Sequence, residues 1–461
     1  MKNTLRILIG ALGLSVFSCD FLEVEPVSSI TSSNFFKSAT DAEAAVTACY
    51  DGLQNSNYNR DVILVSGIMA DEMRASTGGN FVNHQSFNPA LDQGNVRDFW
   101  RDSYAAVQRC LDVLENVPGV KDPALDKDRV MGEAHFIRGL LYFHLTRYYG
   151  KIPLIRQSTT SPAQDLLLPR AETSQVYDAI VSDLLEAERL LPAGSGSKYR
   201  ATKGAARGML ARVYLFRNQA GDLQKALAEC EEVMADNQYQ LVPGTNFADL
   251  FTVGKQNSVE SIFEISYRPN VQQEGGAGAL DDETVPGNRF RVLPEPKLLE
   301  AYAANPGDLR KEAALGLHNS ARFTNLTYIK KYQSGPPEAA NRRVQDPNVI
   351  LIRLADVILM RAECLNELGR TGEAVPFLNQ VRQRAGLAPT AATTPGEVKL
   401  AIENERFLEL AFEGHRWFDL VRWNKAVGII PGLTSPDRIL WPIPAREIDL
   451  NANLLPQNPG Y

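Results

Sequence analysis

The sequence predicts a mainly α fold in which paired helices carry long structured loops and a few short β-strands. Apolar residues recur at helical spacing over most of the chain, and successive helical segments are separated by short turns. Two long regions rich in glycine, proline and polar residues interrupt this pattern. We therefore expect a rigid helical frame that displays two loop regions.

The helical periodicity defines the elements in order. Thr40 to Glu43 has the spacing of a capping box and predicts a helix that runs to Leu53. Further helices are expected at 98–117, 129–149, 174–191, 202–217, 222–236, 350–368, 372–385, 397–412 and 415–425. Most of them form pairs, as helical hairpins do.

Two of these pairs match the tetratricopeptide repeat, a helical hairpin with small, apolar and turn residues at fixed positions. The first match consists of Ala362, Leu365, Gly369, Ala374, Leu378 and Val381. A looser match with a longer turn consists of Ala211, Tyr214, Ala226, Cys230 and Val233. Small residues let paired helices approach closely, and neighbouring hairpins bury a continuous core. We therefore expect irregular tetratricopeptide-like hairpins.

The two interrupting regions are residues 56–97 and 268–348. Short alternating runs at 261–267 and 326–332 predict a few strands in or beside the second region. Long loops on a rigid frame are where binding function usually resides.

Composition and charge exclude several classes of protein. The chain has 461 residues, of which 44% are hydrophobic and 22% charged, so it can bury a large core. Its net charge is -7, and no run of Lys and Arg is longer than two residues. A nucleic-acid surface needs clustered positive charge, so nucleic acid is not an expected partner.

The first 18 residues are typical of a secretory signal. Lys2 and Arg6 precede an apolar run that ends at Ser18 and is too short to span a bilayer. Cys19 follows directly, so residues 16–19 resemble a bacterial lipobox, in which the cysteine is acylated before cleavage. The alternative is an ordinary secretory signal with an incidental cysteine.

The other four cysteines, Cys49, Cys110, Cys230 and Cys364, each lie beside apolar residues in a helical pattern. We expect buried thiols, because free cysteine behaves as a small hydrophobe, although disulfides are possible in an exported protein.

Motifs of catalysis are absent from the sequence. It contains no HExxH, GxSxG, GxxxxGK or CxxC pattern, and its five histidines show no metal-binding spacing. We therefore expect no cofactor and no metal site.

A dense charged segment lies between Glu405 and Trp423. Glu409 and Glu413 are one turn apart, and Arg406 and Arg416 lie three residues before and after them. A glycosidase also uses two carboxylates, but those flank a cleft from separate elements. We interpret the segment as a structural ion-pair network in which each glutamate has its nearby arginine.

Several strings together resemble the SusD/RagB family over nearly the whole chain. They are 405–423, 441–448 with 457–461, 19–26 with 34–36, Trp100 with Tyr104, 133–143 and 149–153. The resemblance implies a lipid-anchored protein on the outer face of the outer membrane. It also implies that the protein captures oligosaccharides and passes them to a SusC-type TonB-dependent transporter.

The expected organisation is a lipoprotein signal peptide at 1–18, an N-terminal SusD-like helical part at 19–240 and a C-terminal SusD/RagB part at 241–461, packed as one body. The expected function is glycan binding without catalysis. Alternatives are a peptide-binding RagB-type uptake component, a secreted carbohydrate-active enzyme that uses Asp71 and Asp92, and a helical-repeat assembly factor that binds only protein.

We expect the ligand face on the two loop regions. The four tryptophans fall in helical or framework segments, so Tyr and Phe are the expected sugar platforms, with nearby polar groups that fix orientation. The candidate ligand-binding residues are Asp71, Arg74, Phe81, Asn83, Phe87, Arg289, Phe290 and Tyr328. Packing of these aromatic residues within their own loops is the alternative for each of them.

Overall fold

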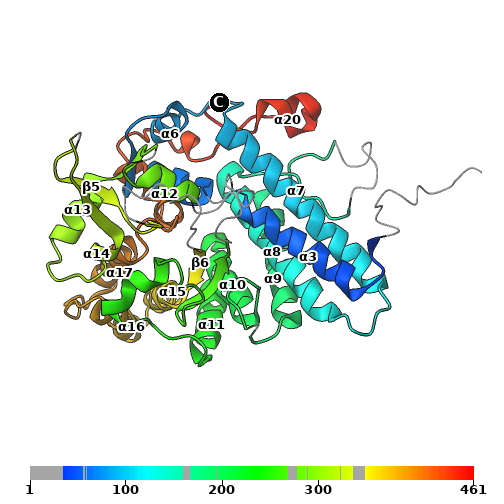
Figure 1. Cartoon of the computed structure of the whole chain (residues 1–461), viewed down its shortest axis with the longest axis horizontal. Coiled ribbons are helices and arrows are strands. Elements are labelled where there is room, and N and C mark those ends of the chain that lie inside the picture. The colour runs from blue at the N-terminus through cyan, green and yellow to red at the C-terminus, as the bar shows by residue number, and fades with distance from the viewer. Residues whose placement is uncertain are drawn as a thin grey trace, which may run out of the picture.

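The computed structural model is mainly helical, as predicted (Figure 1). It describes residues 35–55, 58, 60–158, 167–194, 196–267, 278–287, 289–321, 323–335 and 348–461. The signal peptide and Cys19 lie outside these residues, as do several stretches of the second loop region.

Long helices of the N-terminal half pack side by side (Figure 1). They are α3 (Ala39–Gln54), α7 (Gly94–Asn116), α8 (Lys127–Tyr149), α9 (Thr173–Leu190), α10 (Lys203–Arg217) and α11 (Asp222–Ala235). Helix α3 packs on α7, α8 on α9, and α10 on both α9 and α11. The sequence predicted each of these helices to within four residues at either end.

The cap of α3 differs from the prediction. Ser38 caps the helix and accepts a hydrogen bond from the backbone N–H of Asp41, whose carboxylate binds back to the backbone of Ser38. The predicted box at Thr40 and Glu43 is therefore wrong by two residues, because the chain already becomes helical at Ala39.

The tetratricopeptide-like pairs are confirmed. They are α10 with α11, and α15 (Leu354–Glu367) with α16 (Thr371–Arg384). Ala362, Leu365, Ala374 and Leu378 are buried at the interface, and Gly369 makes the turn with a φ of 76°. Glycine suits this turn because left-handed backbone is costly for other residues.

The predicted helix at 350–368 begins with a strand instead. Residues Val349–Arg353 form β6, which pairs antiparallel with β2 (Ser261–Ile265), and α15 starts only at Leu354. This apolar run is buried on both faces, so its sequence does not distinguish strand from helix.

Among the described residues there are two other short sheets, and both lie in the loop regions. The strand β1 (Met73–Ala75) pairs with β3 (Val292–Pro294), and β4 (Leu315–His318) pairs with β5 (Leu326–Ile329), all antiparallel. The strands predicted at 261–267 and 326–332 are thus confirmed.

The loop regions contain more regular structure than the sequence indicates. The first holds a π-helix (Asp61–Val65), α5 (Ser66–Met69) and α6 (Gly79–Gln85). The second holds α12 (Gly278–Thr284), α13 (Pro296–Ala303) and α14 (Lys311–Ala314). The segments 117–119, 244–251, 436–438 and 452–454 form short 3₁₀ helices. Helices α17 (Pro395–Glu409), α18 (Arg416–Arg422), α19 (Ala426–Ile429) and α20 (Ala445–Leu450) complete the described fold.

One cluster of buried apolar side chains extends from Ala42 to Leu454. Trp100, Trp417 and Trp441 are buried, as predicted, and the Trp441 ring lies 4.1 Å from that of Tyr148 between centroids. Trp423 is only half-buried. The four internal cysteines are buried free thiols, which confirms that prediction.

The predicted ion-pair network exists, but its pairing differs. Glu409 is fully buried and receives hydrogen bonds from Arg310, Arg353 and Arg384. Burial alone would raise the pKa of Glu409, but these three guanidinium groups hold it well below its ordinary value. Glu413 binds Arg353 and Lys331, each at 2.8 Å.

The two arginines near these glutamates in sequence bind other carboxylates. Arg406 binds Asp356 at 2.7 Å and Asp419 at 2.8 Å, and Arg416 binds Asp71. The helix ends at Glu409, so residues 413 and 416 do not continue its face. The predicted partners are therefore wrong, although the structural role is correct.

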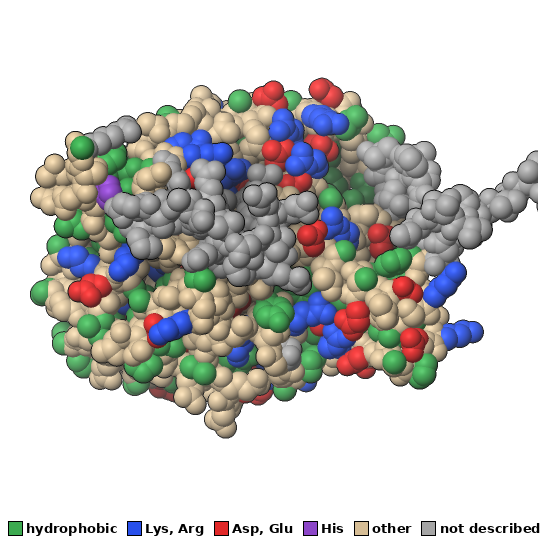
Figure 2. Space-filling view, in the orientation of Figure 1, with side chains coloured by type: hydrophobic (Ala, Val, Ile, Leu, Met, Phe, Trp, Pro, Cys, Tyr) green, Lys and Arg blue, Asp and Glu red, His purple; other side chains and the backbone are tan. Residues whose placement is uncertain are grey.

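On the face shown in Figure 2, basic and acidic side chains lie intermixed above the centre and at lower right. No helix of the described part of the chain is long and apolar enough to cross a bilayer.

Replacing Arg353 by methionine should lower the free energy of unfolding by about 3 to 5 kcal/mol, because Glu260, Glu409 and Glu413 lose a buried partner. Urea unfolding followed by circular dichroism measures this loss. Arg361→Met is the matched control, since Arg361 pairs with a half-exposed Glu231 and should cost less than about 1 kcal/mol. Equal losses in the two variants would contradict the assignment.

Candidate functional site

The pairing of β1 with β3 joins the two loop regions. In this pairing Arg74 lies opposite Leu293. The backbone N–H of Ser76 donates to the carbonyl of Arg291 at 2.7 Å and extends the contact by one step. Segments more than 200 residues apart in sequence therefore form one surface.

A groove of about 540 Å³ lies beside this joint. It is lined by Ser76, Thr77, Gly287, Arg289, Phe290, Leu293, His318, Ser320, Phe323 and Leu326. The elements around it, α6, α12 and β5, lie at the upper left of Figure 1. Its residues come from both loop regions, and those of the second region include residues of the β4–β5 hairpin.

Two half-buried phenylalanine rings face the groove. The rings of Phe290 and Phe323 meet edge to face, with centroids 5.9 Å apart, and His318 lies 6.3 Å from Phe323. Half-buried aromatic faces beside hydroxyl groups are suited to a ligand that has both apolar C–H surface and polar groups.

The backbone of Phe290 is strained. Its φ is 46°, a left-handed value that bulky residues rarely adopt. Its N–H donates to the carbonyl of Asp282 at 3.0 Å, and its carbonyl accepts from the hydroxyl of Ser76 at 3.3 Å. Such strain persists only where surrounding contacts impose it, and it is concentrated at functional sites.

Buried carboxylates balance most of the positive charge at the rim of the groove. Arg289 is exposed and pairs with Asp282 at 3.2 Å and Glu283 at 3.6 Å. Arg291 binds Glu283 with two nitrogens and lies 5.0 Å above the ring of Phe81. The groove therefore presents one exposed guanidinium group above two buried carboxylates.

Among known proteins, the SusD-like protein P38 of Formosa agariphila is 30% identical to this chain, and the match covers 96% of each. The chain belongs to the SusD/RagB family. The family model described as "SusD family" matches residues 299–432, and the one described as "Starch-binding associating with outer membrane" matches residues 20–215.

Solved structures agree with this membership in the SusD/RagB family. A SusD superfamily protein from Bacteroides vulgatus has a TM-score of 0.81 at 25% identity, over 92% of this chain and all of that one. A protein described as a laminarin-binding SusD-like protein has a TM-score of 0.79 at 26% identity, over 92% of this chain and all of that one.

Of the predicted ligand-binding residues, Arg289 and Phe290 line the groove of this SusD/RagB protein. Asp71 is buried and binds Arg416 at 2.6 and 2.9 Å and Lys297 at 2.6 Å. Both carboxylate oxygens of Asp71 are therefore occupied by ion pairs within the protein. Asp92, its suggested catalytic partner, is exposed.

The remaining predicted aromatic residues are also buried. Phe81 and Phe87 are 2% and 3% exposed, and Phe87 packs on Trp417 with ring centroids 5.5 Å apart. Tyr328 is buried, and its hydroxyl donates to Gln333 at 2.7 Å. These side chains offer almost no surface to a ligand.

Two predicted polar residues are half-buried outside the groove lining. Arg74 lies within β1, and the side-chain amide of Asn83 donates to Gln93 at 2.9 Å. Sequence reasoning missed Ser76, Thr77, His318 and Phe323. A single aromatic residue in the polar turn between His318 and Leu326 was the available signal for Phe323.

Beneath the joint, Glu72 is fully buried and accepts a hydrogen bond from the backbone N–H of Phe412 at 3.0 Å. Burial raises its pKa to about 8. Glu72 is therefore largely protonated at neutral pH. Within the described residues, no group of His, Cys, Asp and Glu is arranged to hold a metal ion.

Phe290→Gly should be more stable than Phe290→Ala by about 1 kcal/mol. The positive φ at this position is strained for alanine, whereas glycine adopts it without steric cost. Both variants lose the same ring contact with Phe323, so their comparison isolates the backbone. Denaturant unfolding of the two variants measures the difference. A Phe290→Ala variant as stable as Phe290→Gly would show that the backbone is not strained.

Proposed function

We propose that this protein captures oligosaccharides in the groove beside β1 and β3 and passes them to a SusC-type TonB-dependent transporter. The observation that carries the proposal is the half-buried pair Phe290 and Phe323 beside the hydroxyl groups of Ser76, Thr77 and Ser320. An aromatic ring buries the C–H face of a pyranose, while hydroxyl groups exchange hydrogen bonds with its polar edge.

The comparisons support a glycan as the ligand. The matching structure described as laminarin-binding shares the fold over most of the chain, and a family model that matches 20–215 is described as starch-binding. That same description associates the family with the outer membrane. We propose that the protein itself is held on the outer face of that membrane by a lipid on Cys19.

Phe323→Ala should weaken polysaccharide binding by about threefold to tenfold, because it removes one of the two aromatic rings and leaves the ion-pair network unchanged. Affinity electrophoresis in gels that contain laminarin, starch or xylan measures this change. Phe377→Ala is the matched control, since Phe377 is also half-buried but lies on α16. Its retention should equal that of the wild type.

Other results would favour the alternatives. Release of reducing sugar from the retained polysaccharide would indicate an enzyme. Retention in none of the gels, with oligopeptide binding in calorimetry, would indicate a peptide-binding component of the RagB type. Unchanged retention of Phe323→Ala would place the sugar site elsewhere.

Cys19→Ala should move the full-length protein from the membrane fraction to the soluble fraction of its native host. Several acyl chains on one cysteine anchor a protein stably, whereas a protein without them has no such attachment. Fractionation and intact-mass measurement test the anchor together. Wild-type protein that carries an unmodified Cys19 would contradict it.

A further inference from the structure

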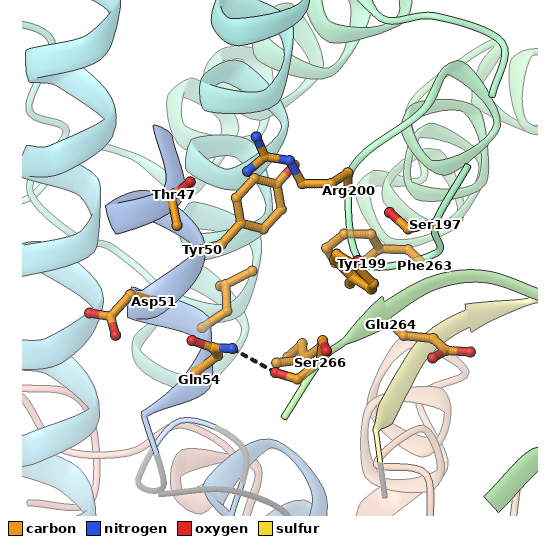
Figure 3. A pocket seen from close by; sticks show the side chains of 12 residues that line it. Thr47, Tyr50, Asp51, Gln54, Ser197, Tyr199, Arg200, Phe263, Glu264 and Ser266 are labelled. Atoms are coloured by element: carbon orange, nitrogen blue, oxygen red, sulfur yellow. Dashed lines mark hydrogen bonds between the residues drawn. The ribbon is translucent and has the colours of Figure 1, made fainter. Parts of the chain in front are cut away.

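A second hollow, of about 660 Å³, lies between α3, the segment Ser197–Arg200 and β2 (Figure 3). It shares no lining residue with the groove described above. At one end, the side-chain amide of Gln54 donates to the carbonyl of Ser266 at 2.6 Å and bridges α3 to the end of β2.

Three of the residues that line this hollow are aromatic. Tyr199 is 42% exposed, and no other aromatic side chain among the described residues is as exposed. Tyr50 projects from α3 toward the same space, and the fully buried Phe263 lies beneath, 6.5 Å from Tyr50 between ring centroids. An aromatic ring left exposed beside a hollow is an unsatisfied apolar surface, and a ligand that covers it gains binding energy.

The guanidinium group at the hollow is already neutralised. Arg200 binds Glu43 at 3.0 Å and Glu133 at 3.2 Å, and it lies 4.9 Å from the centroid of the Tyr50 ring. A guanidinium group with two carboxylate partners has little charge left to attract an anionic ligand.

The acidic side chains at the hollow point away from it in Figure 3. Asp51 binds Arg109 at 2.7 Å on the α7 side, and Glu264 accepts a hydrogen bond from Asn348 at 2.7 Å. The other polar residues that line the space are uncharged and include Thr47, Gln54, Ser197 and Tyr199.

We propose that this hollow is a second saccharide site, which takes a neutral pyranose unit. Tyr199 covers the C–H face of the sugar, and Thr47 and Gln54 exchange hydrogen bonds with its hydroxyl groups. The nitrogen of Gln54 is already used by Ser266, so its carbonyl oxygen is the acceptor. The proposal rests on the proposed glycan binding and adds a contact that is independent of the first groove.

The test uses affinity electrophoresis of the whole protein in gels that contain laminarin or starch, which are neutral, or alginate, which is anionic. Tyr199→Ala should weaken binding to the neutral polysaccharide that retains the wild type by about threefold or more. Tyr199→Phe, which keeps the ring, should retain most of the binding. Leu185→Ala on α9, an exposed apolar residue outside both sites, should behave as wild type.

The double variant Tyr199→Ala with Phe323→Ala separates the two sites, because it should bind more weakly than either single variant. Wild-type retention in Tyr199→Ala, with a loss in Phe323→Ala, would overturn the second site and leave the first. Wild-type retention in Phe323→Ala, with a loss in Tyr199→Ala, would overturn the first site and leave the second. Preferential retention by alginate would overturn the proposed neutral ligand, and no retention of the wild type by any gel would overturn both proposals.

Discussion

The contacts of Asp71 and Glu72, immediately before β1, hold together the joint between β1 and β3 on which the first groove depends. Asp71 binds Arg416 of α18 and Lys297 of α13, and the carboxyl group of Glu72 accepts a hydrogen bond from the backbone N–H of Phe412. The backbone carbonyl of Glu72 also accepts a hydrogen bond from Glu295 at 2.9 Å. These contacts fix β1 against β3 and thereby bring the two loop regions together.

The joint is continuous with the buried ion network through the turn between α17 and α18. Glu409 and Glu413 in that region are held by Arg353, which ends β6, while Arg416 of the same region holds Asp71. Removing one member of a buried pair leaves an uncompensated charge, which is far more costly than losing a surface pair. The network thus explains how a groove built from loops is held by a frame of helices.

Much of the helical frame could be predicted because a helix has a local sequence signal, the spacing of its apolar residues. The helix expected at 129–149, which is α8, and the hairpin positions around Gly369 follow from the local spacing of residues. The groove could not be predicted in the same way, because β1 and β3 are three residues each and show no alternation. Asp71 and Phe323 illustrate the limit: the two partners of Asp71 lie 226 and 345 residues away, and the exposure of Phe323 depends on a hairpin that packs beside β3.

Hydrogen exchange of Asp71→Asn tests the central claim most directly, since this variant keeps the size of the side chain and removes its charge. Our account predicts faster exchange at the backbone amides of Ser76 and Glu295, whose hydrogen bonds bridge the two loop regions, with α8 and α9 unchanged. Exchange at Ser76 and Glu295 equal to that of the wild type, or a uniform increase over the whole chain, would contradict the claim that this ion pair holds the groove together.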